Sequence, residues 1–284
     1  MDWVLVVFGT LLIATVMVDV FWTTLTTRGA GIFTIGVIAG VRLLVCTCCL
    51  TLGRRGPLMT AGPLAVTLMG AVWLAGLWSG WVLVFSGMSA SVLDTSTKMP
   101  VGLDGYIYYV GFTLSTLGVG DLIPAGSVPR LLTTAASFNG LVLVTLVITY
   151  AVPLVGGAVQ RREVAFELYL INAARNRDPG LSPSALARDL QSVRRDLLHC
   201  TEQRMAYPML DLYFTRSREF SLAWQLAEAA GQAQACLPSI AADAEEARIL
   251  RDFLLVTERY LALHGLEAGP LEHRLERLAR KDVW

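Results

Sequence analysis

Four long runs of apolar residues, separated by polar gaps, occupy the first part of the sequence. They cover residues 3–24, 32–52, 58–85 and 131–159, and the last two runs contain no charged residue. A helix of about 20 apolar residues is needed to cross the hydrocarbon core of a bilayer. The pattern therefore predicts four transmembrane helices, with a polar segment between the third and the fourth.

The last part of the sequence has a different, amphipathic pattern that is typical of soluble helices. Ser182 and Pro183 are a helix start, with serine as the N-cap and proline in the first turn. One apolar stripe with helical spacing follows, and it consists of Leu186, Leu190, Val193 and Leu197. We expect further helices over residues 210–236, from a cap at Ser239 to about His264, and around Leu271, Leu275 and Leu278. No alternating strand pattern is present, so neither a Rossmann-type nor a β-roll ligand domain is expected.

Composition agrees with this division into a membrane half and a soluble half. The 284 residues are 54% hydrophobic and 16% charged, and the mean hydropathy is +0.55. A soluble domain is about 25% charged. Only eleven charged residues precede Gln160, whereas seventeen basic and eighteen acidic residues follow from Arg161 onward. No basic excess indicates a nucleic-acid partner, and the five cysteines give no disulfide framework.

Positive charges next to the apolar runs predict the orientation in the cell membrane. Arg54 and Arg55 lie between the second and third runs, and Arg161 and Arg162 follow the fourth. Short basic loops stay in the cytoplasm. With four crossings, both termini are then cytoplasmic, and the loop of residues 86–129 faces outside. The N-terminus has no basic cluster and does not resemble a cleaved signal peptide, so the first run is expected to remain as an anchor.

Six residues in the polar segment point to a specific chemistry. They are Thr116, Leu117, Gly118, Val119, Gly120 and Asp121. Glycines at alternate positions allow a positive φ at each, and this alternation can turn successive carbonyl oxygens to one side. A row of carbonyls repeated by symmetry around an axis forms oxygen cages for a bare monovalent cation. Gly-x-Gly-Asp also occurs in ordinary turns, so its context matters.

The stretch and its context resemble the potassium-channel superfamily. The family's filter reads T-V-G-Y-G-D, and this chain has Leu117 for valine and Val119 for tyrosine. The spacing of Asp121, Pro124, Arg130 and Gly140 is similar to the pore loop and inner helix of simple bacterial potassium channels. The resemblance implies a re-entrant pore helix over residues 104–115, an outer helix before it and an inner helix after it.

The resemblance also implies an organisation and an assembly. It divides the chain into two N-terminal transmembrane helices (1–56), a pore domain (57–160) and a cytoplasmic helical domain (161–284). The expected fold class is an all-α membrane protein with four transmembrane helices and a re-entrant pore helix. One pore loop supplies a quarter of a filter, so we expect a homotetramer. K⁺ would pass between the carbonyls of residues 116–119 and the Thr116 hydroxyl, and Asp121 would brace the outer mouth.

Further residues take roles that the resemblance implies. Tyr108 and Tyr109 align with aromatic residues that pack around the filter, although an interfacial aromatic cluster would have the same sequence. The fourth run holds Asn139, Gly140 and Pro153. Gly140 matches the inner-helix hinge, and Pro153 lies near the expected cytoplasmic gate. Ordinary membrane helices tolerate both glycine and proline.

Asp19 and Arg42 are ionisable residues inside the first and second apolar runs. Such groups are costly in a membrane and are usually paired. One interpretation is a sensor or a proton site. The other, which we favour, is a structural ion pair between neighbouring helices. A single arginine does not make a voltage sensor.

The chain is expected to be a channel rather than an enzyme. No Ser-His-Asp, Cys-His or paired-carboxylate arrangement is recognisable, and no cofactor is expected besides K⁺ as the permeant ion. The alternatives are a poorly selective monovalent cation channel, or a membrane-anchored sensor or scaffold that acts through its helical domain. The expected partners are other copies of the chain, the lipid bilayer and an unidentified ligand or protein at the helical domain. The sequence does not say what opens the channel.

Overall fold

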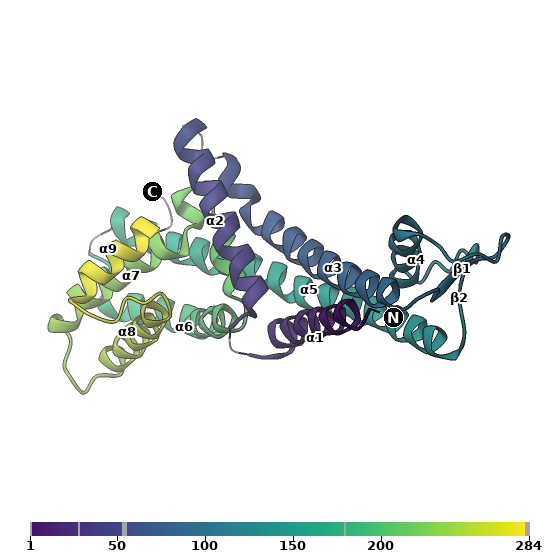
Figure 1. The fold of residues 1–284 in the computed structure, drawn as a ribbon. Helices are drawn as coiled ribbons and strands as arrows, with labels where there is room; N and C mark the ends of the chain where they lie inside the picture. Colours follow the sequence, from purple (N-terminus) through teal and green to yellow (C-terminus); the bar gives the residue numbers. More distant parts are fainter. Residues whose placement is uncertain (1, 28, 53–55, 179, 282–284) are drawn as a thin grey trace. The chain divides into compact units, whose positions relative to one another are not determined.

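The computed structural model describes residues 2–27, 29–52, 56–178 and 180–281, and Figure 1 labels its elements. The described residues are almost entirely helical, which confirms the all-α membrane class. Within the described residues, four helices are long and apolar enough to cross a membrane, and the third span, Leu58–Gly87, begins inside the turn η1 and continues through α3. The elements are α1 (Trp3–Leu25), α2 (Ile32–Leu52), η1 (Gly56–Thr60), α3 (Ala61–Gly87), β1 (Val92–Asp94), α4 (Leu103–Leu114), β2 (Leu122–Pro124), α5 (Ser127–Arg177), α6 (Pro183–Ala206), η2 (Pro208–Leu212), η3 (Arg218–Phe220), α7 (Leu222–Cys236), η4 (Leu237–Ser239), α8 (Glu245–Leu263) and α9 (Leu271–Lys281).

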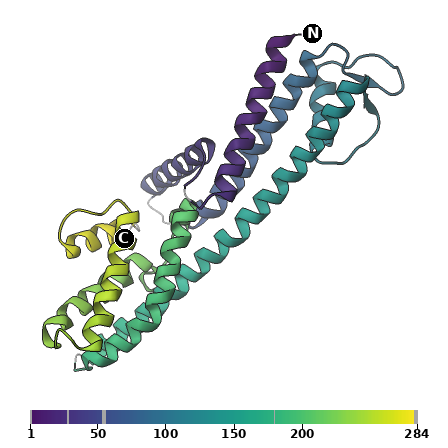
Figure 2. The same cartoon turned by 90° about the horizontal axis from the view of Figure 1, so that it is seen from below.

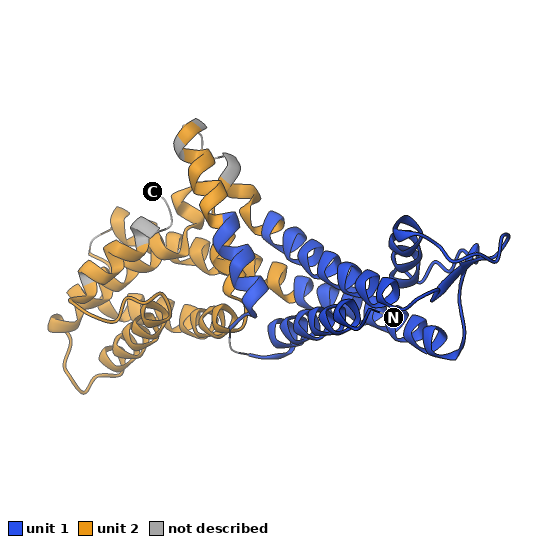
Figure 3. Cartoon of the chain, in the orientation of Figure 1, with its two compact units in different colours: residues 1–41, 64–152 blue, residues 42–63, 153–284 orange. Residues whose placement is uncertain are grey.

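The chain forms two compact units, which Figure 3 distinguishes by colour. Unit 1 contains residues 1–41 and 64–152, and unit 2 contains residues 42–63 and 153–284. Helices α2, α3 and α5 each continue from one unit into the other. The predicted division at residues 56 and 160 stays a prediction. Arg54 and Arg55, which supported the predicted orientation, lie outside the described residues.

Helices α1 and α3 run antiparallel and side by side in unit 1 (Figure 2), and glycines lie at their contact. The backbone N–H of Asp2 donates to the carbonyl of Gly87, 2.7 Å away. A Cβ on Gly9 would lie 2.6 Å from the carbonyl oxygen of Gly80, closer than any side chain tolerates. Only glycine therefore allows the two backbones to approach this closely. The beginning of α1 lies beside the end of α3.

This arrangement contradicts the predicted topology. A cytoplasmic N-terminus with the loop 86–129 outside would place the beginning of α1 and the end of α3 on opposite faces of the membrane. The structure places them together, so the two assignments are incompatible. The predicted cytoplasmic position of the N-terminus follows only from counting four crossings. The segment before α1 carries Asp2 and no base, so the positive-inside rule says nothing about it directly.

Unit 2 contains the amphipathic helices. The observed first residues of these helices can be compared with the predicted N-caps. The Ser182 hydroxyl accepts from the N–H of Ala185, so α6 begins as predicted. Helix α7 begins at Leu222 with Ser221 as its cap, twelve residues later than predicted, because two 3₁₀ turns follow Pro208. The cap predicted at Ser239 is wrong: that hydroxyl donates to the Cys236 carbonyl, and α8 begins at Glu245. The predicted stripe of α6 is buried in the core of this unit.

Candidate pore and selectivity filter

The pore helix α4 ends in a hydrogen-bonded turn at the first residue of the candidate filter. The N–H of Thr116 donates to the carbonyl of Thr113 (3.1 Å), and that of Leu117 donates to the carbonyl of Phe112 (2.9 Å). These two bonds form a Schellman motif, which needs a left-handed residue after the C-cap. That residue is Thr116, with φ at +58°. A helix end carries partial negative charge, so α4 directs this charge toward the start of the filter.

Left-handed backbone conformations recur at every second residue of the candidate filter. The φ angles are +58° at Thr116, +56° at Gly118 and +86° at Gly120. The positive φ predicted for the two glycines is confirmed, and the one at Thr116 was not foreseen. A Cβ on Gly118 or Gly120 would meet nothing within 4 Å. The backbone conformation, rather than a lack of space within the chain, therefore requires glycine at both positions.

Thr95, which the sequence pattern does not single out, holds the C-terminal end of the candidate filter. The hydroxyl of Thr95 donates to the carbonyl of Gly120 (3.0 Å), and its N–H donates to the carbonyl of Asp121 (2.8 Å). Thr95 directly follows β1, which pairs antiparallel with β2 on the other side of the filter. The short sheet thus ties the segment before α4 to the segment after the filter. Three-residue strands give no recognisable alternation in the sequence.

An acidic recess lies beside the C-terminal end of the candidate filter. Asp94, Asp104, Asp121 and Tyr108 line part of a cavity of about 420 Å³. Hydrogen bonds from the N–H groups of Thr97 and Ser96 lower the pKa of Asp94 below its ordinary value and favour its charged form. Fixed negative charge at a mouth raises the local concentration of cations. Among the described residues, no cluster suited to holding a metal ion was found.

The inner helix α5 holds α4 through two hydrogen bonds. The hydroxyls of Tyr109 and Thr133 lie 2.6 Å apart, and Thr133 donates its own hydrogen to the Pro129 carbonyl. Tyr109 is therefore the donor to Thr133. The hydroxyl of Ser137 donates to the carbonyl of Thr113 at the end of α4 (3.2 Å). Within one chain, Tyr109 thus braces the pore helix rather than the filter itself.

Gly140 of α5 lies directly against the end of α4. A Cβ on Gly140 would overlap the carbonyl oxygen of Leu114. A backbone carbonyl cannot turn aside as a flexible side chain can. The absence of a side chain at Gly140 therefore has a packing reason besides the predicted hinge, which stays a prediction.

The other predicted pore residues are mostly exposed in the single chain. Leu117 is 72% exposed and Val119 is 49% exposed. Tyr108 and Pro153 are also exposed, whereas Asn139 is partly buried. Helix α5 continues without interruption through Pro153. Their roles in the filter and the gate stay predictions.

Asp19 is buried in unit 1 and accepts hydrogen bonds from three described residues. Its donors are the indole Nε1 of Trp73 (2.8 Å), the N–H of Phe33 (2.9 Å) and the hydroxyl of Thr34 (3.1 Å). The carboxylate thereby joins α1, α3 and the first turn of α2. Arg42 belongs to unit 2, and the predicted pair between Asp19 and Arg42 stays a prediction.

Removing the indole donor should destabilise the protein. We expect Trp73→Phe to lower the free energy of unfolding by about 1–3 kcal/mol, the cost of leaving a buried acceptor without its donor. Trp78→Phe is the matched control, because the Nε1 of Trp78 donates to the Ile107 carbonyl at an exposed site. Thermal unfolding in detergent measures both. An equal decrease for the two variants would contradict the importance of the Asp19 contact.

Comparisons with known proteins match the part of the sequence that contains these residues. A family model described as an ion channel matches residues 71–155, which include α4, the filter and the first half of α5. The chain is also similar to the uncharacterized membrane protein YdjJ of Bacillus subtilis (strain 168). The two are 30% identical over 223 residues, which are 76% of this chain and 64% of the relative. The chain thus spans less than two thirds of the relative's length. No solved structure matches the chain.

Proposed function

We propose that four copies of this chain assemble into a potassium-selective channel, because a family model described as an ion channel matches residues 71–155. The observation that carries this proposal is the alternation of left-handed residues at Thr116, Gly118 and Gly120 at the end of α4. Such a backbone directs successive carbonyls to one side, where K⁺ exchanges its hydration shell for carbonyl oxygens. K⁺ then moves down its gradient, and no chemical step is required.

Exposed apolar surface supports the assembly. The side chains of Leu117 and Val119 are largely uncovered in a single chain. Helix α5 presents a stripe of exposed apolar residues with helical spacing, formed by Phe138, Leu141, Val144, Ile148 and Val152. Lipid covers part of such a surface, whereas a filter segment needs protein around it. Fourfold symmetry places four filter segments around one axis.

The proposed orientation places the filter mouth outside and residues 161–284 in the cytoplasm of a bacterial-type cell membrane. The beginning of α1 then lies on the outer side, next to the end of α3. The chain between the end of α1 and the beginning of α3, which carries Arg42, begins and ends on the cytoplasmic side. A tag before Trp3 that is accessible only from inside would contradict this orientation.

Selectivity depends on Val119, which replaces the tyrosine expected from the resemblance. Valine has no hydroxyl and cannot hydrogen-bond behind the filter, which favours a looser site. The competing function is therefore a poorly selective monovalent cation channel. Every proposed oxygen ligand apart from the Thr116 hydroxyl belongs to the backbone, so we propose that the preference for K⁺ is retained.

Reconstitution into liposomes tests the function. We expect a K⁺ gradient to drive ion flux that protein-free liposomes lack. In mixed K⁺ and Na⁺ the reversal potential should follow the K⁺ gradient. A reversal potential near zero under opposing K⁺ and Na⁺ gradients would favour the poorly selective channel. Absence of flux across a range of pH and candidate ligands would favour the sensor or scaffold.

A further inference from the structure

A small cavity in unit 2 brings together three arginines from distant parts of the sequence. It measures about 190 Å³ and is lined by Arg42 from α2, Arg161 from α5 and Arg204 from α6, and Asp211 of η2 faces it as well. Phe214, Leu263, His264 and Leu278 complete the lining. Most residues that line this cavity come after the membrane half in the sequence. Arg161 lies just after the last apolar run.

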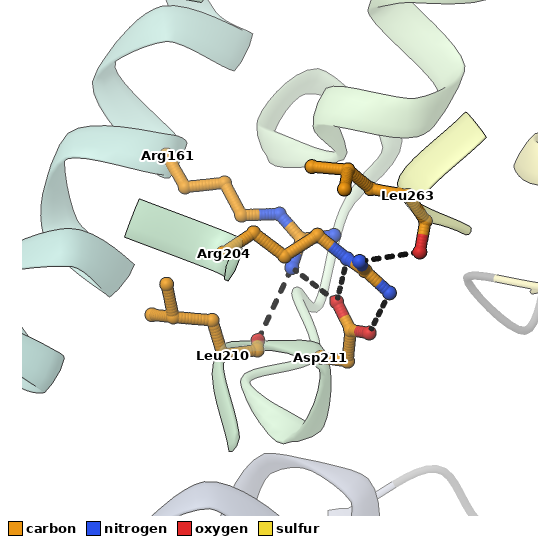
Figure 4. Close-up of polar contacts among 5 residues, drawn as sticks. All are labelled: Arg161, Arg204, Leu210, Asp211 and Leu263. Carbon is orange, nitrogen blue, oxygen red and sulfur yellow. Dashed lines mark hydrogen bonds and ion pairs between the residues drawn. The ribbon is translucent and has the colours of Figure 1, made fainter. Parts of the chain in front are cut away.

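Asp211 organises two of the arginines (Figure 4). The Nε of Arg204 donates to one carboxylate oxygen (3.1 Å) and its Nη2 donates to the other (2.7 Å). The Nη1 of Arg204 also donates to the Leu263 carbonyl. Arg161 donates through Nη1 to the Leu210 carbonyl (3.1 Å), and the same nitrogen lies 3.8 Å from the Asp211 carboxylate. The two guanidinium groups are held in place by these contacts.

Positive charge exceeds negative charge in this cavity. Burial acts to raise the pKa of Asp211, but the charges of Arg204 and Arg161 hold it below its ordinary value, so the carboxylate stays ionised. It is the single acidic side chain among the described lining residues, against three arginines. The side chains of Arg161 and Arg204 are only 15% and 17% exposed. Charges that are largely removed from water require partners, and Asp211 is the acidic side chain of the lining that serves both Arg161 and Arg204.

We propose that this cavity binds the phosphate group of an anionic ligand. Arginine presents a planar set of N–H donors that matches phosphate oxygens. Arg42 is exposed and has no hydrogen bond or ion pair with the described residues of unit 2, so within this unit its donors are available to a ligand. Sites for drug-sized molecules measure about 300–1,000 Å³. The smaller volume here suits a single phosphate group.

Two sources can supply this group. Basic residues directly after a membrane helix attract anionic lipid headgroups, and Arg161 has this position. A soluble phosphate compound has the same chemistry. Binding at this site does not require ion conduction. Experiment can distinguish the two sources of the phosphate group.

A bound phosphate would act on the pore through η2. A Cβ on Gly62, at the beginning of α3, would lie 2.7 Å from the ring of Tyr213, the residue that ends η2. A Cβ on Gly157, on α5, would lie 3.3 Å from the Leu210 side chain of η2. The turn that carries Asp211 thus packs against both helices that continue into the pore region. The effect on ion flux, unlike the binding itself, rests on the proposed function.

Binding is measured on the full-length protein in detergent. We expect inorganic phosphate to raise the midpoint of thermal unfolding relative to chloride at equal ionic strength, because a ligand that binds the folded state stabilises it. Micelles that contain phosphatidylglycerol supply the anionic lipid headgroup. Micelles that contain phosphatidylcholine instead are the comparison in the same unfolding measurement. Arg42→Gln should lower the affinity for whichever probe stabilises the wild type by at least about tenfold. This is the effect expected from losing one charge-assisted hydrogen bond. Arg195→Gln is the matched control, since Arg195 is an exposed arginine of α6 outside the cavity.

The outcomes distinguish the two sources of the phosphate group. They also test the binding site separately from the proposed channel function. Stabilisation by phosphate alone supports a soluble ligand, and stabilisation by phosphatidylglycerol alone supports a lipid headgroup. If Arg42→Gln and the wild type respond alike to both probes, the binding site is overturned. In liposomes, a change of flux with phosphatidylglycerol content that Arg42→Gln removes supports regulation. Binding without flux in any liposome would overturn the proposed channel function and leave the binding site standing.

Discussion

Replacing Gly120 with alanine is expected to abolish K⁺ flux in reconstituted liposomes. Gly120 has φ at +86°, and a left-handed conformation costs an L-residue about 1–2 kcal/mol. In a tetramer this cost recurs in each of four neighbouring chains. The strain is relieved by rotating the backbone, which turns a carbonyl of the filter away from the ion path. The same argument applies to Gly118.

Gly126→Ala is the matched control for this variant. Gly126 has nearly the same φ, +88°, and a Cβ at either glycine would meet nothing within 4 Å. Gly126 precedes α5 and lies outside the filter. We expect both variants to lose similar thermal stability and only Gly126→Ala to conduct K⁺. Equal flux through the two variants would contradict the assignment of residues 116–121 as the filter.

Gly140→Ala is expected to destabilise the protein and eliminate flux. Alanine is ordinarily preferred to glycine inside a helix by about 1 kcal/mol. Here the added Cβ would overlap the Leu114 carbonyl, and overpacking typically costs about 1–3 kcal/mol. The clash would also displace the end of α4, where the filter begins. Packing should therefore reverse the usual sign of this substitution.

Gly70→Ala provides the comparison, because a Cβ there would lie at an ordinary contact distance of 3.8 Å from the Val147 side chain. We expect Gly70→Ala to keep or raise the midpoint of thermal unfolding and to conduct K⁺. The comparison also separates two roles of Gly140. A hinge alone would change the open probability of a channel with unaltered thermal stability, whereas a packing role lowers that stability. An unfolding midpoint of Gly140→Ala equal to that of the wild type would contradict the packing role.

Local signals in the sequence determined the long apolar helices, the start of α6 and the positive φ of the two filter glycines. The four apolar runs could be recognised as candidate membrane-spanning helices because a helix needs a minimum number of apolar residues to cross a bilayer. Ser182 was readable as a cap because its hydroxyl accepts from an N–H only three residues away. Gly118 and Gly120 were readable because glycine alone adopts a positive φ without cost. Each of these features depends on residues close together in the chain.

The tertiary structure decided which distant residues meet. The donation from Thr95 to Gly120 joins positions 25 residues apart, and that from Trp73 to Asp19 joins positions 54 apart. The direction of α1 was fixed by its glycine contacts with α3, and no charge pattern at the N-terminus encodes it. The left-handed Thr116 depends on where α4 ends, which residue type does not reveal. Contacts of this kind follow from helix packing, because the partner of a polar group is known only once the helices are placed beside one another.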